Sequence, residues 1–152
     1  MYLFTVQDSS MNRLLFMPTK PSDPKVQPLI EASIKNDFLG EIVRERLNNQ
    51  IVVFVYDGQY AGYAVPRQEG LYWRVGPIYV DPKYQGKGIA KAFITSFFEH
   101  RKGRAYIDPA NLSSSKAFLA AGFRKTGKVL RGSRGDLLDQ YEWTPSSKAL
   151  QW

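Results

Sequence analysis

The chain has 152 residues, 43% of them hydrophobic and 14% aromatic, and its formal net charge is +7. That length fits one domain with a sizeable core, and the aromatic content excludes a wholly disordered chain. The sequence contains no cysteine and one histidine, which excludes disulfides, thiolate metal sites, a cysteine nucleophile and two-histidine metal motifs within the chain. The positive charge favours anionic partners, among them nucleic acids and nucleotide cofactors.

The N-terminal part predicts two strands followed by two helices. Apolar runs at 3–5 and 14–18 are typical of short strands, and they define an N-terminal strand region over 1–20. Over 26–47, apolar residues recur at near-helical spacing, which predicts two short helices broken near Asp37, the expected N-cap of the second. No stretch resembles a signal peptide or a membrane span, so we expect a cytoplasmic protein without a membrane partner.

Three strands in series come next. Residues 51–56 are rich in β-branched and aromatic side chains, and Asp57-Gly58 is a strong signal for a hairpin turn. A second strand over 59–65, a turn over 66–70 and a third strand over 71–80 complete an expected antiparallel meander.

The C-terminal half alternates between helices and strands. A polar loop over 81–88 precedes an apolar helical pattern that begins at Ile89 and ends near Gly103, the expected left-handed C′ residue. The remaining predicted elements are a strand over 105–107, a helix over 113–121 ended by Gly122, strands over 123–129 and 137–143, a basic loop over 131–135 and a loose tail over 144–152.

The loop after Val80 carries the most functional information. A strand runs into a glycine loop that opens a helix, where glycines admit an anion and free N–H groups point at it. The six residues fit the pattern Gln/Arg-x-x-Gly-x-Gly/Ala and are Gln85, Gly86, Lys87, Gly88, Ile89 and Ala90. They match neither a P-loop nor the three-glycine dinucleotide fingerprint. An ordinary glycine turn before a helix is the alternative to a phosphate site.

This pattern resembles the acetyl-CoA loop of the GNAT superfamily of N-acyltransferases. The resemblance covers about 37–143 and includes the strand end at Val80-Asp81-Pro82-x-Tyr84-Gln85, the helix after the loop, and a second motif formed by Asn111 and Gly122-Phe123. It implies an α/β fold in one domain over 1–152. The implied sheet is mixed, mainly antiparallel and of about six to seven strands, with helices on both faces.

The resemblance also implies acetyl-CoA as co-substrate and assigns residues to it. The loop amides from Gly86 to Ala90 would bind the pyrophosphate, with Gln85 in the loop and added charge from Lys87. Pantetheine would pair with the backbone of Val80 like an added strand. The remaining contacts come from the backbone N–H of Ile78 toward the thioester oxygen, from Asn111 to pantetheine, from Lys116 to the adenosine phosphates, and from the ring of Phe118. Lys116 on a solvated helix face is the alternative.

Two positions depart from the family pattern. Phe118 stands where many members carry a tyrosine that protonates the sulfur, and Arg74 stands where some carry a glutamate base. We therefore expect Tyr141 as replacement acid and Asp108 as base, the alternatives being a tyrosine on a sheet face and a turn aspartate before Pro109. Further acidic candidates are Asp57, Glu69 and Asp139.

The expected function is transfer of an acetyl group from acetyl-CoA to an amine. Residues 101–135 hold nine lysines and arginines and one acid, Asp108. This basic segment keeps open an acyltransferase that acts on nucleic acid, either aminoacyl-tRNA or a DNA base. The two departures keep open a catalytically silent acyl-CoA-binding module. We expect a monomer or a homodimer, and no metal.

Overall fold

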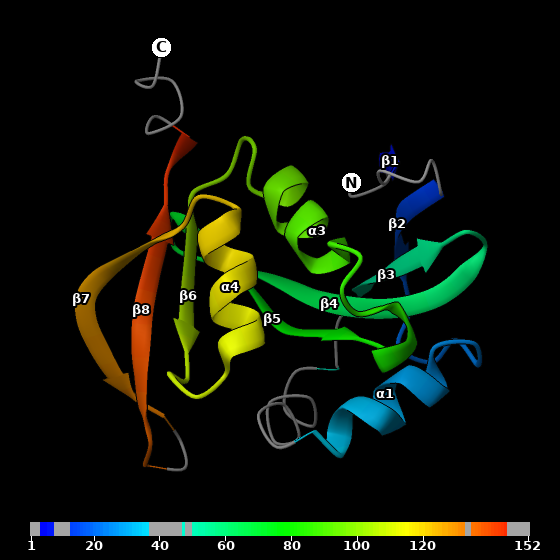
Figure 1. Ribbon diagram of the computed structural model, residues 1–152, viewed down its shortest axis with the longest axis horizontal. Coiled ribbons are helices and arrows are strands. Elements are labelled where there is room, and N and C mark those ends of the chain that lie inside the picture. The colour runs from blue at the N-terminus through cyan, green and yellow to red at the C-terminus, as the bar shows by residue number, and fades with distance from the viewer. Residues whose placement is uncertain (1–3, 8–12, 37–46, 48–49, 133–134, 146–152) are drawn as a thin grey trace. The chain divides into compact units, whose positions relative to one another are not determined.

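The computed structural model describes residues 4–7, 13–36, 47, 50–132 and 135–145 (Figure 1). The chain forms two compact units, Met1–Pro66 with Val75–Ala90 and Arg67–Arg74 with Lys91–Trp152. The single domain expected from the sequence stays a prediction. Asp37, the second predicted helix, part of the basic loop and the end of the predicted tail lie outside the described residues.

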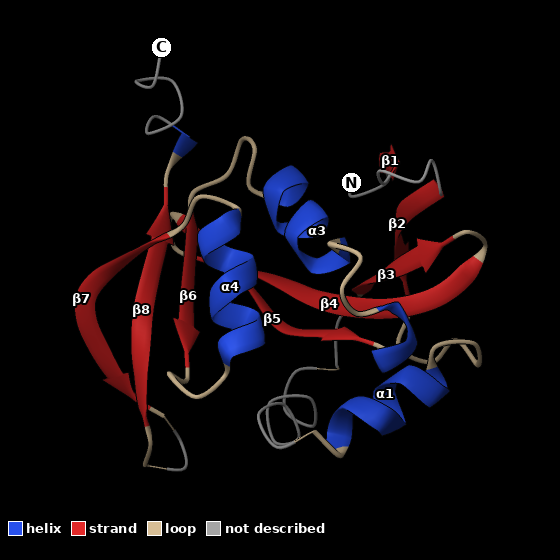
Figure 2. Ribbon diagram, viewed as in Figure 1, coloured by secondary structure: helices blue, strands red, loops and turns tan. Residues whose placement is uncertain are grey.

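The first unit consists of antiparallel strands and one described α-helix (Figure 2). Its strand order is β1-β2-β3-β4-β5. Its elements are β1 (Phe4–Gln7), β2 (Arg13–Thr19), α1 (Gln27–Ile34), β3 (Ile51–Tyr56), β4 (Gln59–Glu69), β5 (Tyr72–Val80) and the 3₁₀ turn η1 (Pro82–Tyr84), with the ends of β4 and β5 shared with the second unit.

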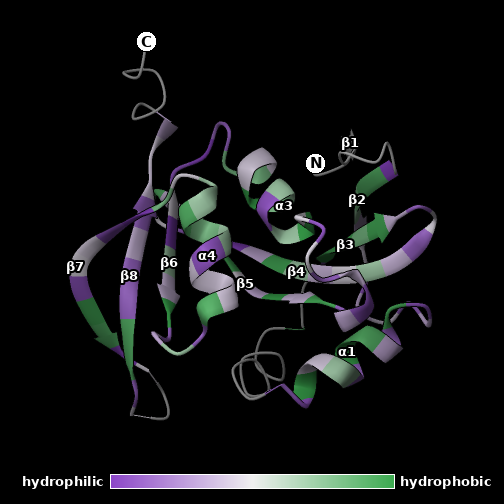
Figure 3. Ribbon diagram, viewed as in Figure 1, coloured by the Kyte–Doolittle hydropathy of each residue, from purple (hydrophilic) through white to green (hydrophobic). Residues whose placement is uncertain are grey.

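Strand β3 has the predicted bounds and lies between β2 and β4. Every residue of β3 except Val55 is buried, which explains its near-continuous run of apolar residues (Figure 3). The predicted hairpin turn is confirmed, because Asp57 and Gly58 both adopt positive φ, at 50° and 83°. Strand β4 is longer than predicted: it continues to Glu69, so the turn falls at Gly70 and Leu71 instead of over 66–70.

The core of the first unit lies between α1 and the sheet. Leu29 and Ile30 of α1 pack against residues of β3 and β4, among them the fully buried Tyr63. Ser33 of α1 donates a hydrogen bond to the Ile30 carbonyl, so the hydroxyl of Tyr63 donates to the Ser33 oxygen. This bond satisfies the polar end of a buried tyrosine and joins the helix to the strand.

The second unit has the strand order β5-β6-β8-β7. Its other elements are α3 (Ile89–Phe97), whose first two residues belong to the first unit, β6 (Gly103–Ile107), α4 (Leu112–Ala120), β7 (Arg124–Arg131) and β8 (Leu137–Trp143). Its core is aromatic: the rings of Phe98 and Phe118 each contact Phe123 edge to face, with centroids 4.9 and 5.0 Å apart. No helix in the described parts of the chain has both the length and the apolar character needed to cross a membrane.

The prediction that α3 ends near Gly103 is wrong. The helix ends at Phe97, and Gly103 begins β6 without positive φ. A Cβ at Gly103 would lie 2.5 Å from Phe123 and 2.6 Å from Phe98, so glycine is required there by ring packing. The predicted end of the next helix at Gly122 is confirmed, because α4 ends at Ala120 and Gly122 has φ +102°.

The mixed, mainly antiparallel α/β class is confirmed. Trp73 of β5 pairs with Gly103 of β6 in parallel, whereas the ladders β1–β2, β2–β3, β3–β4, β6–β8 and β7–β8 are antiparallel. The described sheet has eight strands, slightly more than predicted.

Candidate functional site

Hydrogen bonds connect the glycine loop with the strands that precede it in the sequence. The Asp81 backbone N–H donates to the Ala61 carbonyl at 2.8 Å, and the Asp81 carboxylate accepts from the Lys83 N–H at 2.9 Å to cap η1. The side-chain amide of Gln85 donates to the Val80 carbonyl at 3.0 Å. These bonds hold both ends of the turn that leads from β5 to the glycines.

The loop itself has the form of an anion cradle. Gly86 and Gly88 adopt φ of +82° and +75°, and apart from the adjoining residues no atom of the described chain lies within 4 Å of a Cβ built on either. Within the described chain, no backbone carbonyl accepts from the N–H groups of Gly86, Lys87 or Gly88. Ile89 is only 2% exposed and anchors the start of α3. Free N–H groups in open space before a helix can bind phosphate oxygens.

Lys87 is positioned by an aromatic pair that sequence reasoning missed. Its ammonium lies 5.4 Å from the centroid of the buried Tyr56 ring, which meets the Tyr84 ring edge to face at 5.8 Å. Tyr56 ends β3, and no local pattern could have connected it with a lysine 31 positions later. The pair keeps a positive charge beside the loop.

The backbone N–H groups of β5 do not alternate regularly between its two neighbouring strands. Trp73 donates its N–H to Lys102 at 2.8 Å on the β6 side, whereas Asp81 donates to Ala61 in β4. In a regular strand, the N–H groups of residues an even number of positions apart point toward the same neighbouring strand. Those of Trp73 and Asp81 point toward different strands, so the regular alternation is interrupted between them. Counting back from Asp81, the peptide groups of Ile78 and Val80 point away from β4.

Gly62 of β4 lets the backbone of β5 approach closely at Tyr79 and Val80. A Cβ at Gly62 would lie 2.2 Å from the Tyr79 carbonyl oxygen and 3.0 Å from the Val80 Cα. The backbone position of Val80 therefore depends on a glycine in the neighbouring strand.

The second predicted motif forms the start of α4. Asn111 is the N-cap, because its side-chain oxygen accepts from the Ser114 N–H at 3.3 Å. Its backbone carbonyl accepts from the N–H and the hydroxyl of Ser115. With the oxygen engaged, the side-chain NH₂ of Asn111 has no partner among the residues described and remains able to donate.

The other predicted residues of the second unit have distinct surroundings. Lys116 is exposed on α4, and Phe118 is 3% exposed against Phe123. The Asp108 carboxylate accepts from the Ala110 N–H at 2.9 Å, which gives it the turn role named as the alternative. Tyr141 is 2% exposed in β8, and no described residue bonds its hydroxyl.

The structure thus divides the predicted residues between the units. Ile78, Val80 and 85–90 lie together in the first unit. Asp108, Asn111, Lys116, Phe118 and Tyr141 all lie in the second.

The remaining acidic candidates have structural partners or turn positions. Glu69 accepts from Arg74 at 3.2 Å and from Arg67 at 3.1 Å, so the arginine at the expected base position carries its own carboxylate partner. Asp139 pairs with Lys125 at 3.4 Å, and Asp57 occupies the hairpin turn.

Comparison with known families settles the relationship. The family model of the acetyltransferase (GNAT) domain matches residues 20–134, more than half of the chain. The chain belongs to the GNAT acetyltransferase family. Membership confirms the resemblance seen in the glycine loop and the prediction of an acetyl-CoA-dependent acyltransferase.

Solved GNAT structures share the fold. An acetyltransferase of this family from Bacillus anthracis is 17% identical, with a TM-score of 0.65 over 91% of this chain and 96% of that one. One from Elizabethkingia anophelis, solved with acetyl-CoA bound, is 12% identical, with a TM-score of 0.65 over 86% and 97%. AAC(6′)-Ib, solved with paromomycin and acetyl-CoA, is 12% identical, with a TM-score of 0.69 over 91% and 97%. No curated protein matches the chain.

Proposed function

We propose that this GNAT protein transfers an acetyl group from acetyl-CoA to the nitrogen of an amine acceptor. The observation that supports this most is the loop before α3, where the N–H groups of Gly86, Lys87 and Gly88 have no backbone acceptor in the described chain. Positive φ at both glycines and the open space around them fit a pyrophosphate group.

The residues of the first unit fit the phosphate and pantetheine parts of acetyl-CoA. The amides of Gly86 to Ala90 would hold the pyrophosphate, and Lys87 would leave the Tyr56 ring or add its charge from there. The edge of β5 at Ile78 and Val80 would pair with the pantetheine amides. In the second unit, the free NH₂ of Asn111 would donate to a pantetheine carbonyl, Lys116 would meet adenosine phosphates, and Phe118 would supply an apolar wall.

Bound acetyl-CoA supplies an activated acetyl group as a thioester. The amine nitrogen forms a bond to the acetyl carbon, the carbon–sulfur bond breaks, and the CoA thiolate leaves. The nitrogen loses one proton and the thiolate gains one. The N–H of Ile78 would stabilise negative charge on the carbonyl oxygen. We keep Tyr141 as the proposed proton donor to sulfur and Asp108 as the proposed base.

Thermal unfolding with and without acetyl-CoA tests the cofactor assignment. Saturating acetyl-CoA, at a hundredfold excess over Kd, should stabilise the protein by about 2.7 kcal/mol. The same measurement with free adenosine provides a control that lacks the phosphates. No shift with acetyl-CoA would contradict the proposal.

A nucleic-acid acceptor is a second candidate, favoured by the exposed basic strand β7. All eight residues of β7 are exposed, and four of them are basic: Arg124, Lys125, Lys128 and Arg131. Phosphate contacts give a salt dependence with a slope of about −0.9 per duplex phosphate. Binding of tRNA and duplex DNA between about 50 and 200 mM salt should therefore be steep, and steeper than for K128E/R131E. A flat salt response would remove this candidate.

A catalytically silent acyl-CoA-binding module is the remaining alternative. It would show the acetyl-CoA stabilisation without transfer to any amine. The cytoplasmic location and the monomeric or homodimeric state stay predictions.

A further inference from the structure

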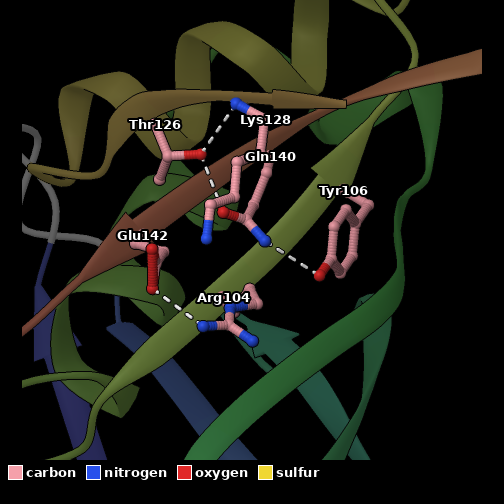
Figure 4. Close-up of polar contacts among 6 residues, drawn as sticks. All are labelled: Arg104, Tyr106, Thr126, Lys128, Gln140 and Glu142. Atoms are coloured by element: carbon pink, nitrogen blue, oxygen red, sulfur yellow. Dashed lines mark hydrogen bonds and ion pairs between the residues drawn. The ribbon is translucent and has the colours of Figure 1, made fainter. Parts of the chain in front are cut away.

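The sheet of the second unit has a polar face opposite its aromatic core. Side chains alternate along each strand, so Ala105 and Tyr141 belong to the buried face and their neighbours to the other. On the polar face, two cross-strand pairs lie directly opposite one another: Arg104 with Glu142, and Tyr106 with Gln140 (Figure 4). The Arg104–Glu142 pair is an ion pair of 3.0 Å.

A chain of hydrogen bonds on this face has a determined direction. The Lys128 backbone N–H can only donate, and it donates to the Thr126 hydroxyl oxygen at 3.2 Å. The Thr126 hydroxyl donates to the side-chain oxygen of Gln140 at 2.7 Å. The Gln140 NH₂ must then face Tyr106, and it donates to the phenol oxygen at 3.0 Å (Figure 4).

The series of hydrogen bonds ends at the Tyr106 hydroxyl, whose proton is not used within the described residues. The phenol oxygen of Tyr106 accepts the bond from Gln140, so its own proton points elsewhere. No acceptor for that proton occurs among the described residues. Gln140 is 6% exposed, and both its side-chain oxygen and its side-chain nitrogen are hydrogen-bonded, which holds the phenol in place.

Arg74 lies beside Tyr106, and Arg74 and Arg67 together already bind one carboxylate. The guanidinium carbon of Arg74 lies 4.8 Å from the centroid of the Tyr106 ring. Arg74 and Arg67 approach the same oxygen of Glu69, at 3.2 and 3.1 Å. The two guanidinium groups carry ten N–H groups, and most of them are not bonded to the shared Glu69 oxygen. Their side chains remain 20% and 31% exposed, so a solute can reach them.

Among the described residues, the charges of this cluster do not balance. Glu142 neutralises Arg104, whereas Arg67 and Arg74 share one described carboxylate, that of Glu69. Burial lowers the pKa of Arg67, and the neighbouring charge of Arg74 lowers it further. The Arg67 Nε is buried and has no hydrogen-bond partner among the residues that the structure describes. A second carboxylate would offset the excess positive charge and satisfy free donors.

We propose that Arg67, Arg74 and the Tyr106 hydroxyl bind the carboxylate of the acceptor, so that the acceptor is an amine that also carries a carboxylate, as amino acids do. The inference rests on the proposed N-acetyltransferase function. Glu69 shows that a carboxylate fits the two arginines, which favours this anion over the larger phosphate. Tyr106 supplies a donor whose direction is set by Gln140.

Binding of a product-like probe tests the site without any transfer reaction. N-acetylglycine carries an acetamide and a carboxylate, and N-acetylglycinamide differs by having an amide in place of the carboxylate. In NMR titrations of protein labelled with ¹³C at tyrosine, N-acetylglycine should shift the Tyr106 signal and bind at least about tenfold tighter than the amide. Equal affinity for the two probes would overturn the proposal.

Paired variants locate the carboxylate. Tyr106→Phe should weaken N-acetylglycine binding roughly 10- to 100-fold, because it removes one hydrogen bond to a charged group. Tyr72→Phe is the matched control: its ring lies on the same face at 3.9 Å from the Arg104 guanidinium, and it has no part in the proposed site. Arg74→Gln should weaken binding at least as much as Tyr106→Phe. Equal losses in both tyrosine variants would contradict the role of Tyr106, and circular dichroism confirms that each variant folds.

Inorganic phosphate and a transfer assay complete the test. Tighter binding of phosphate than of N-acetylglycine at equal ionic strength would overturn the carboxylate assignment and favour the nucleic-acid candidate. With labelled acetyl-CoA, amino acids should be acetylated with at least about tenfold higher kcat/KM than their amides, and Arg74→Gln should abolish the difference. Probe binding that depends on Tyr106 without any transfer would contradict the proposed function alone. Transfer without that preference would contradict the carboxylate site alone.

Discussion

Replacing Gly62 with alanine should displace the part of β5 at Val80, where we propose that pantetheine binds. The new Cβ would lie 2.2 Å from the Tyr79 carbonyl oxygen, which is 1.2 Å inside the 3.4 Å at which ordinary contact begins. The obstacle is backbone of β5, which cannot rotate away as a side chain could. A shift of that size would break the 2.8 Å hydrogen bond from Asp81 to Ala61.

The expected loss in the free energy of unfolding has two parts, the steric clash and the lost hydrogen bond. Overpacking a well-packed site costs about 1–3 kcal/mol, and a lost hydrogen bond adds about 1 kcal/mol. The total of about 2–4 kcal/mol corresponds to a fall in Tm of about 5–15 °C for a protein of this size. Because Val80 moves with Tyr79, the folded variant should also bind acetyl-CoA more weakly.

Gly103→Ala is the control for this experiment. It creates a comparable clash, at 2.5 Å, but against the ring of Phe123 in the second unit and not against the cofactor strand. Differential scanning calorimetry gives the loss of stability, and isothermal titration calorimetry below Tm gives the acetyl-CoA affinity. Both variants should lose stability, and only Gly62→Ala should lose affinity. An unchanged Tm for Gly62→Ala, or an equal loss of affinity in both variants, would refute the reasoning.

Further predictions concern the loop, the missing acid and pH. Gly88→Glu should abolish the thermal shift with acetyl-CoA, whereas Gly70→Glu, which also has positive φ and open space around it, should keep that shift. Tyr141→Phe should lower turnover and spare acetyl-CoA affinity in steady-state kinetics and calorimetry; equal turnover would remove Tyr141 from the mechanism. Phe118→Tyr should fold with a loss below about 2 kcal/mol in chemical denaturation and leave activity unchanged or raised. Burial raises the pKa of Tyr63 above its ordinary value of 10.0, so the unfolded phenol ionises first and the free energy of unfolding should fall as pH rises above 10. Denaturation curves for Tyr63→Phe should show a weaker fall, and an identical pH profile would contradict this.

Elements governed by local chemistry were predictable from the sequence. The bounds of β3, the turn at Asp57 and Gly58, and the end of α4 at Gly122 all follow from β-branched runs and left-handed residues. The glycine loop was predictable for the same reason, because its function depends on backbone conformation at Gly86 and Gly88.

Features that depend on distant residues were not predictable. The apolar spacing of α3 runs to Phe98 and gives no sign of the end at Phe97, where side chains outside the helix bond the carbonyls. Trp143 donates to the Phe98 carbonyl at 2.7 Å, and Arg101 donates to the Phe97 carbonyl at 2.7 Å. Gly103 serves the rings packed against it, a requirement that no local pattern encodes.

The polar face of the second unit illustrates the same limit. Arg74 stood out in the sequence as a departure from a family position, yet its partners come from other parts of the chain. Glu69 lies across a hairpin turn and Tyr106 lies on another strand. Only the pairing of strands reveals that these groups form one cluster.

Mass spectrometry of amine pools incubated with isotope-labelled acetyl-CoA tests the central claim most directly. The account predicts that label appears as an amide on an amine acceptor with wild-type protein and is lost with Gly88→Glu. Label on no amine, under conditions where calorimetry shows acetyl-CoA bound, would contradict an N-acetyltransferase and leave a silent acyl-CoA-binding module.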